Sequence, residues 1–150
     1  HSHGYKEFSN FQIISLIKLS KFLIKKYKIN LKNILGHSDI APERKKDPGE
    51  KFPWNYLAKK NIGFWHNLNK EFFLKNRKIK INSLQKKIFI KNLIKIGYPI
   101  KKTKQSKLNS EKYLKLIIKA FQRRFRQELI DGKNDKECLL ISQNIVKKFK

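Results

Sequence analysis

The sequence predicts an α+β protein in two parts, an N-terminal part with a helix and a short buried strand, followed by a small three-helix bundle. Three observations lead to this prediction. An amphipathic pattern covers residues 9–28, a short apolar run follows at 33–37, and three helical patterns come after residue 80. Hydrophobic residues make up 39% of the 150-residue chain, which is enough for a core and too many for a disordered chain.

Residues 9–28 have the periodicity of an amphipathic helix. Ser9 and Gln12 have the spacing of a capping box, in which each side chain satisfies a free backbone N–H of the first turn. One face is then marked at intervals of three or four residues by Ile13, Leu16, Ile17, Ser20, Ile24 and Tyr27. The run NILGH follows at 33–37, and we expect it to be a buried strand that carries His37 at its end.

Residues 38–53 should form a loop, because Pro42, Pro48 and Pro53 each lack a backbone donor and restrict the residue before them. The stretch WNYLAKK at 54–60 is compatible with one or two turns of helix. This part of the chain therefore places a stiff, irregular segment between two short regular elements.

Three short helices are expected after residue 80. The first begins near Ser83 and ends at Gly97, the second covers 109–126, and the third follows Asp135 as its N-cap. The single cysteine, Cys138, falls on the apolar face of the third helix and is expected in the core. With a boundary in the polar stretch 74–82, the predicted domains are residues 1–75 and residues 80–150.

The net charge of +26 suggests an anionic partner such as nucleic acid, an acidic membrane or an anionic wall polymer. The charge is spread evenly, since residues 1–79 carry 17 basic and 6 acidic side chains and residues 80–150 carry 20 and 5. Nearly all the basic residues are lysines, as the codon usage of an AT-rich genome would also give. No apolar run reaches the length of a membrane span. A nucleic-acid binder, with affinity that falls steeply with salt, is one alternative.

The stretch GHSDIAPERKKDPGEKFPW at 36–54 differs from the rest of the chain in composition. Its prolines stiffen a segment with His37 near one end and Asp47 ten residues later, and an imidazole and a carboxylate are ligands that suit Zn²⁺. Lys45 lies two residues before Asp47 and could stabilise negative charge on a carbonyl oxygen. The residues alone leave an ordinary polar loop as the other interpretation.

This stretch closely resembles the signature loop of the zinc-dependent N-acetylmuramoyl-L-alanine amidases of the type-2 amidase family. The resemblance extends upstream through HGYKEFSNFQIISLIKLSKFLIKKYKINLKNILGH and downstream through FPWNYLAKKNIGFW. It implies that His37 and Asp47 bind zinc and that Lys45 is catalytic. Other positions are expected to organise the loop or to pack, namely Asp39 and Arg44 in the first role, Pro53 and Trp54 in the second, and His66 at the surface or in packing.

The C-terminal part resembles the three-helix peptidoglycan-binding domain that is often appended to such amidases. The stretches LQKKIFIKNLIKIGY, IIKAFQRRF and DGKNDKECLLI carry this resemblance. The matching positions are Leu84, Gln85, Gly97, Phe121, Gln122, Asp131 and Gly132. The resemblance implies that the chain is the C-terminal part of a mixed α/β zinc amidase domain followed by this bundle.

Two parts of the family's site have no counterpart in the sequence. A third zinc ligand, a histidine, and a glutamate that acts as general base both lie upstream of the helix at 9–28 in the family. Candidates near the site are His1 and His3 for the ligand, whereas Glu7, Glu43 and Glu50 do not stand in the motif position of the base. The chain opens with HSHGYKEF, and we expect it to be truncated at its N-terminus.

The expected function is hydrolysis of the amide bond between N-acetylmuramic acid and L-alanine by zinc-activated water, on peptidoglycan or muropeptides. The alternative is a catalytically inactive, peptidoglycan-binding remnant of a split or decaying amidase gene. A separate chain that supplies the missing N-terminal part is a further possibility. We expect neither a specific nucleic-acid partner nor a membrane span, and we expect a location in the bacterial cell envelope, periplasmic or secreted, rather than the cytoplasm.

Overall fold

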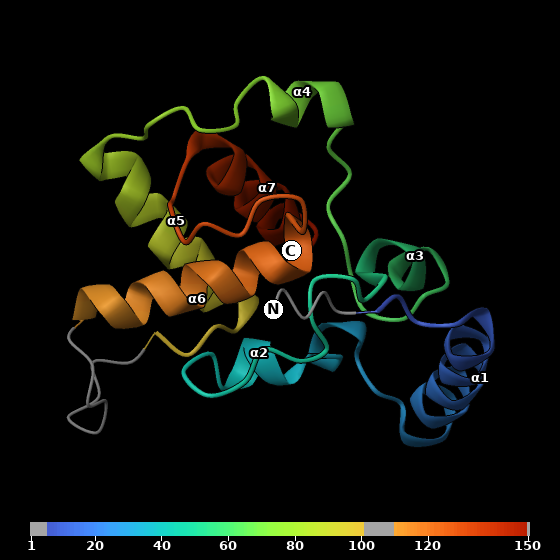
Figure 1. Cartoon of the computed structure of the whole chain (residues 1–150). Coiled ribbons are helices and arrows are strands. Elements are labelled where there is room, and N and C mark those ends of the chain that lie inside the picture. The colour runs from blue at the N-terminus through green and yellow to red at the C-terminus, as the bar shows by residue number, and fades with distance from the viewer. Residues whose placement is uncertain (1–5, 101–109, 150) are drawn as a thin grey trace.

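The computed structural model describes residues 6–100 and 110–149, which form helices joined by loops (Figure 1). The helices are α1 (Asn10–Tyr27), α2 (His37–Ile40), α3 (Trp54–Lys59), α4 (Lys70–Leu74), α5 (Ser83–Ile96), α6 (Ser110–Phe125) and α7 (Lys136–Lys147), with a 3₁₀ turn, η1, at Leu31–Asn33. Within these residues there is no strand, and the one isolated β-bridge joins Lys80 to Asp135. The prediction of an α+β fold with a mixed α/β part is therefore wrong for the described chain, which is helical.

The expected strand at 33–37 shows why. Ile34 and Gly36 do have extended backbone, with ψ angles of 102° and 161°. Their backbone groups are satisfied by side chains: Arg124 Nη2 donates to the Ile34 carbonyl at 2.9 Å, and the Gly36 N–H donates to Asp39 Oδ2 at 2.9 Å. A strand needs a neighbouring strand for its hydrogen bonds, and these side chains take that place. His37, expected at the end of this strand, instead begins the short helix α2, so that residues 38–40 are helical where a loop was expected.

The other helices confirm the signals in the sequence. In α1, the Ser9 N–H donates to Gln12 Oε1 at 2.9 Å and the Gln12 N–H donates to Ser9 Oγ at 3.3 Å, which is the expected capping box. Helix α5 ends at Gly97, which has a left-handed φ of 110°. Helix α7 begins after Asp135, whose side chain accepts from the Cys138 N–H at 3.0 Å. These termini are predictable because their partners are only a few residues apart.

The core of the described residues lies between α5, α6 and α7, which pack together in Figure 1. Its most buried apolar side chains include Phe89, Leu93, Ile117, Phe121, Cys138, Ile141 and Ile145, each with 0% exposure. The segment after α3 also contributes, since Phe64, Trp65 and Leu68 pack against this cluster. The division into domains at 1–75 and 80–150 stays a prediction.

Helix α1 differs from this bundle and lies apart from it in Figure 1. It has no buried residue, and Phe11 is 84% exposed. Most of the apolar burial among the described residues therefore comes from α5–α7.

Among the described residues, no helix combines the length and the hydropathy needed to cross a membrane.

Candidate functional site

Residues 36–54, here called the site loop, are folded so that their two ends meet. The Ser38 N–H donates to the Asp47 carbonyl at 3.0 Å, which ties the start of α2 to the far side of the loop. Gly36 allows this closure, because a Cβ at that position would lie 2.7 Å from Pro48 Cδ and 3.3 Å from Trp54 Cζ2. The chain thus brings together residues nine positions apart without a sheet.

His37 and Asp47, here called the site pair, lie in direct contact through His37 Nδ1 and Asp47 Oδ2. Both side chains face solvent, with 68% and 55% of their surface exposed. The hydrogen bond to His37 lowers the pKa of Asp47, and the positive charge of Lys45 acts in the same direction. The pair therefore places an accessible imidazole next to an ionised carboxylate, and these two groups fit the ligand preferences of zinc.

The site pair provides two ligands, whereas a catalytic zinc site usually has three protein ligands. Within residues 6–100 and 110–149, no group of three or more His, Cys, Asp or Glu side chains could hold a metal. His1 and His3, the expected alternative ligands, lie outside the described residues. Of the acidic candidates for the base, Glu50 lies 3.8 Å from Arg123 Nε.

Lys45 lies on the wall of a cleft of about 780 Å³, here called the site cleft. Its backbone N–H donates to the Ala41 carbonyl at 3.0 Å and its side chain is exposed. The cleft is lined on the loop side by Pro42, Glu43, Arg44, Lys45, Lys46, Asp47, Pro48 and Glu50, and on the other side by Leu116, Lys119, Arg123 and Ile130. The lysine and one member of the site pair therefore open into the same space, against a wall from α6 and the segment after it.

A buried ion pair holds the site loop on the bundle. Asp39 Oδ2 accepts from Arg124 Nη1 at 2.6 Å, and Asp39 Oδ1 accepts from the Tyr98 hydroxyl at 2.8 Å. The Arg124 guanidinium also lies over Trp54, 4.1 Å from the ring centroid. Burial raises the pKa of Tyr98, and the Asp39 charge raises it further, so that the hydroxyl remains a donor. These contacts confirm that Asp39 organises the loop and that Trp54 packs.

Arg44, also expected to organise the loop, does so only through its backbone, whose N–H donates to the Ala41 carbonyl at 3.2 Å, while its side chain is exposed. His66 packs: it is 7% exposed and stacks on Trp65 with 5.1 Å between ring centroids. Burial lowers the pKa of His66 to about 4, so this imidazole is neutral at pH 7. It lies outside the site cleft.

The buried arginines were not predicted from the sequence, although a signal was present. The chain has five arginines and 32 lysines, and three of the arginines fall within RRFR at 123–126. Arg123, Arg124 and Arg126 are all buried, at 9%, 2% and 3% exposure. Arginine presents a planar fork that suits buried carboxylates better than an ammonium does, so rare arginines in a lysine-rich chain mark such positions.

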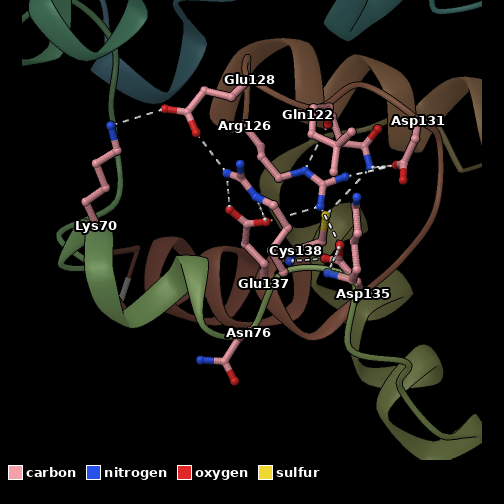
Figure 2. A network of polar contacts seen from close by, with 12 residues as sticks. Lys70, Asn76, Gln122, Arg126, Glu128, Asp131, Asp135, Glu137 and Cys138 are labelled. Carbon is pink, nitrogen blue, oxygen red and sulfur yellow. Dashed lines mark hydrogen bonds and ion pairs between the residues drawn. The ribbon is translucent and has the colours of Figure 1, made fainter.

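A second cluster of charges, here called the scaffold network, is formed by Arg77, Arg126, Glu128, Asp131, Asp135 and Glu137 (Figure 2). Arg126 donates to Asp131 at 3.0 Å and to Glu137 at 3.2 Å, and it also pairs with Asp135 at 2.5 Å. Arg77 Nε donates to the other side of the network, at Glu137 Oε2, over 2.8 Å. Because Arg126, Asp135 and Glu137 at its centre are buried and paired, the network holds α7 to the segments around it and is not a candidate site.

Cys138 lies beside this network and is fully buried. Burial raises the pKa of its thiol to about 12. The thiol is therefore unreactive at neutral pH, as expected of a core residue.

Comparisons with known proteins agree with the resemblance that was drawn from the site loop. The family described as N-acetylmuramoyl-L-alanine amidase, Amidase_2, matches residues 1–50. The N-acetylmuramoyl-L-alanine amidase AmiD of Escherichia coli is 33% identical over 151 aligned residues, which cover 99% of this chain and 53% of AmiD. The 1,6-anhydro-N-acetylmuramyl-L-alanine amidase AmpD of Enterobacter cloacae is 46% identical over 48 residues, which cover 32% of this chain and 26% of AmpD.

Solved structures also match nearly the whole chain. A complex of E. coli AmiD with the substrate anhydro-N-acetylmuramic acid-L-Ala-D-γ-Glu-L-Lys matches 97% of this chain and 55% of that chain, with a TM-score of 0.80 and 33% identity. AmpDh3 from Pseudomonas aeruginosa in complex with anhydromuramic pentapeptide matches 97% and 56%, with a TM-score of 0.77 and 28% identity. The chain thus spans about half the length of AmiD. The resemblance to type-2 N-acetylmuramoyl-L-alanine amidases is confirmed.

Proposed function

Because the chain is related to the type-2 N-acetylmuramoyl-L-alanine amidases, we propose that it carries part of the active site of a peptidoglycan amidase. The reaction would be hydrolysis of the amide bond between N-acetylmuramic acid and L-alanine. The substrate would be a muropeptide of the kind bound in the AmiD structure, which ends in L-Ala-D-γ-Glu-L-Lys. The observation that carries the proposal is the contact between His37 and Asp47 beside a cleft that Lys45 also lines.

In this proposal, His37 and Asp47 would be two of the ligands of a zinc ion. When bound, the zinc supplies activation of a water molecule and polarisation of the substrate carbonyl. Asp47 is ionised over a wide pH range because His37 donates to it, so it is available to a metal without first losing a proton. The third ligand and the general base would come from residues that the described structure does not bring to this pair.

Lys45 would stabilise the negative charge that develops on the carbonyl oxygen. Its ammonium group is exposed in the site cleft and lies close enough to Asp47 to lower the pKa of that carboxyl. A cation held at this position interacts more strongly with the carbonyl oxygen as negative charge develops on it. This stronger interaction in the transition state is what lowers the barrier.

The proposal extends to the rest of the chain. Residues 1–75 would be the C-terminal portion of the catalytic domain, and residues 80–150 a three-helix domain that binds peptidoglycan. A substrate of this class, together with the similarity to AmiD, supports a location in the bacterial envelope.

The test is hydrolysis of anhydro-N-acetylmuramyl-L-Ala-D-γ-Glu-L-Lys by the chain, with the released peptide separated by chromatography. We expect turnover that a chelator abolishes, that zinc restores and that Lys45→Met lowers about a hundredfold or more. Lys115→Met, an exposed lysine outside the site cleft, is the matched control. Retention on peptidoglycan without turnover would instead support the inactive remnant.

A further inference from the structure

The site cleft has one wall that the proposed chemistry does not use. This wall comes from α6 and the segment after it, and it consists of Leu116, Lys119, Arg123 and Ile130. The wall faces the loop that carries Lys45 and Asp47, as expected from the position of α2 next to α6 in Figure 1. A substrate held at the site pair would therefore meet side chains from the C-terminal part of the chain.

Arg123 is the unusual residue of this wall. It is 9% exposed, and its Nε makes no hydrogen bond in the part of the chain that the structure describes. The nearest carboxylate, Glu50 Oε2, lies 3.8 Å from that nitrogen, which is within ion-pair range but beyond a hydrogen bond. By contrast, Arg124 and Arg126 in the same RRFR stretch donate to carboxylates at 2.6 Å and 3.0 Å. The Nε of Arg124 also lacks a hydrogen bond, but the Arg124 guanidinium has Asp39 as a close carboxylate partner, which Arg123 does not have. A buried N–H without an acceptor is costly, so an anionic ligand would stabilise the guanidinium of Arg123.

Charge and shape point to the same kind of ligand. The cleft is lined by five basic side chains, Arg44, Lys45, Lys46, Lys119 and Arg123, against three acidic ones, Glu43, Asp47 and Glu50. The stem of Lys119 is placed against Gly132, where a Cβ would lie 3.2 Å from Lys119 Cε. Leu116 and Ile130 are the apolar members of the wall. The wall thus combines two cations with a small apolar surface.

We propose that Arg123, with Lys119, binds a carboxylate of the stem peptide of the substrate. This inference rests on the proposed function, which supplies a substrate with a D-γ-Glu residue. A γ-linked glutamate leaves its α-carboxylate free, and it lies one residue beyond the alanine whose amide bond would be cut. An arginine fork matches a carboxylate through two parallel hydrogen bonds, and the neighbouring apolar side chains suit the aliphatic part of the peptide. Arg123 and Lys119 would be specificity residues rather than catalytic ones.

The experiment measures binding, so it needs neither zinc nor turnover. The ligands are N-acetyl-L-Ala-D-γ-Glu-L-Lys-amide and the matched peptide in which the glutamate α-carboxylate is a carboxamide. These two peptides differ only in the charge at issue. Their affinities for the whole chain are compared by calorimetry for the wild type, Arg123→Met, Arg123→Lys, Lys119→Met and Lys115→Met. Circular dichroism and the unfolding midpoint verify that each variant folds.

We expect the wild type to bind the acid peptide about tenfold or more tightly than the carboxamide, since a hydrogen-bonded charge pair is at stake. Arg123→Met should remove this preference, Arg123→Lys and Lys119→Met should reduce it, and Lys115→Met should keep it. Equal affinity of the wild type for the two peptides, or a preference that survives Arg123→Met, would overturn the inference, as would failure of the wild type to bind either peptide. A preference for the acid peptide in a chain without zinc-dependent turnover would contradict the proposed catalysis but support the carboxylate site.

Discussion

The scaffold network and the site pair are both built from oppositely charged groups, but they differ in burial and in the number of partners. Arg126, Asp135 and Glu137 have side chains that are 1%, 5% and 0% exposed, and each lies within an ion-pair distance of another member. The side chains of His37 and Asp47 are 68% and 55% exposed, and each has the other as its partner. The same kind of contact therefore occurs in two different environments.

This difference distinguishes charges that stabilise the fold from charges that are available for binding or catalysis. Charges removed from water must be fully paired, and once paired they fix one arrangement of the surrounding helices. Charges at the surface contribute little to stability and remain available to a metal or a substrate. The link between the two regions is the buried pair of Arg124 with Asp39, which fastens the site loop to the bundle.

Breaking the scaffold network should have the largest effect. Arg126→Met leaves Asp135 and Glu137 buried without their central cation, and we expect the free energy of unfolding to fall by about 4 kcal/mol. Urea unfolding followed by circular dichroism measures this. Arg44→Met is the matched control, because that arginine is exposed, and it should shift the midpoint little. A similar small shift for Arg126→Met would show that the network does not stabilise the fold.

Breaking the link should have the next largest effect. Asp39→Asn keeps a side chain of the same size but leaves the Arg124 guanidinium buried without its carboxylate, and we expect a loss of about 3 kcal/mol. The variant should also loosen residues 36–54, which hydrogen exchange at the Ser38 amide would report. Protection at Ser38 equal to that of the wild type would mean that the loop holds its shape without this pair.

Acid should weaken the packing around His66. Burial lowers its pKa from 6.5 to about 4, so the folded chain binds this proton less readily than the unfolded chain does. The stabilisation of the folded state that comes from this lowered pKa is fully present above pH 6.5. It is lost as the pH falls towards 4, by roughly 3 kcal/mol in all. Unfolding free energies of the wild type and His66→Gln, measured from pH 7 to pH 4, should converge at low pH. Parallel curves for the two proteins would contradict the burial of a neutral imidazole.

The smallest effect on stability is expected at the site pair. His37→Ala removes an exposed partner, so its unfolding midpoint should be indistinguishable from that of Lys115→Met. A substantial loss of stability would place His37 among the residues that hold the fold together. The expected consequence of this variant is instead a loss of zinc binding.

The sequence predicted the features whose partners lie close together along the chain. The capping box of Ser9 with Gln12 spans three residues, and the N-cap at Asp135 also acts within one turn. The loop from Gly36 to Trp54 was recognised because its residue types and their spacing are distinctive. The roles of His37, Lys45 and Asp47 remain predictions, although the structure places these residues in one region.

The features that the sequence did not predict depend on distant partners. Arg124 satisfies the Ile34 carbonyl across 90 residues of sequence and Asp39 across 85, and Tyr98 reaches Asp39 across 59. No local pattern at Ile34 reveals that a side chain, and not a second strand, will donate the hydrogen bond to its carbonyl. The strand at 33–37 was therefore predicted for a segment whose backbone is extended but makes no hydrogen bonds to a second strand.

Binding of zinc by the site pair is tested most directly by the effect of zinc on the unfolding of three proteins, the wild type, His37→Ala and Asp47→Asn. A ligand that binds only the folded state stabilises it, by about 1.4 kcal/mol for each tenfold rise in free zinc above its Kd. We expect this dependence for the wild type and none for either variant, with the three proteins equally stable when zinc is absent. No effect of zinc on the wild type, or the same effect on all three, would contradict the assignment of a metal to the site pair.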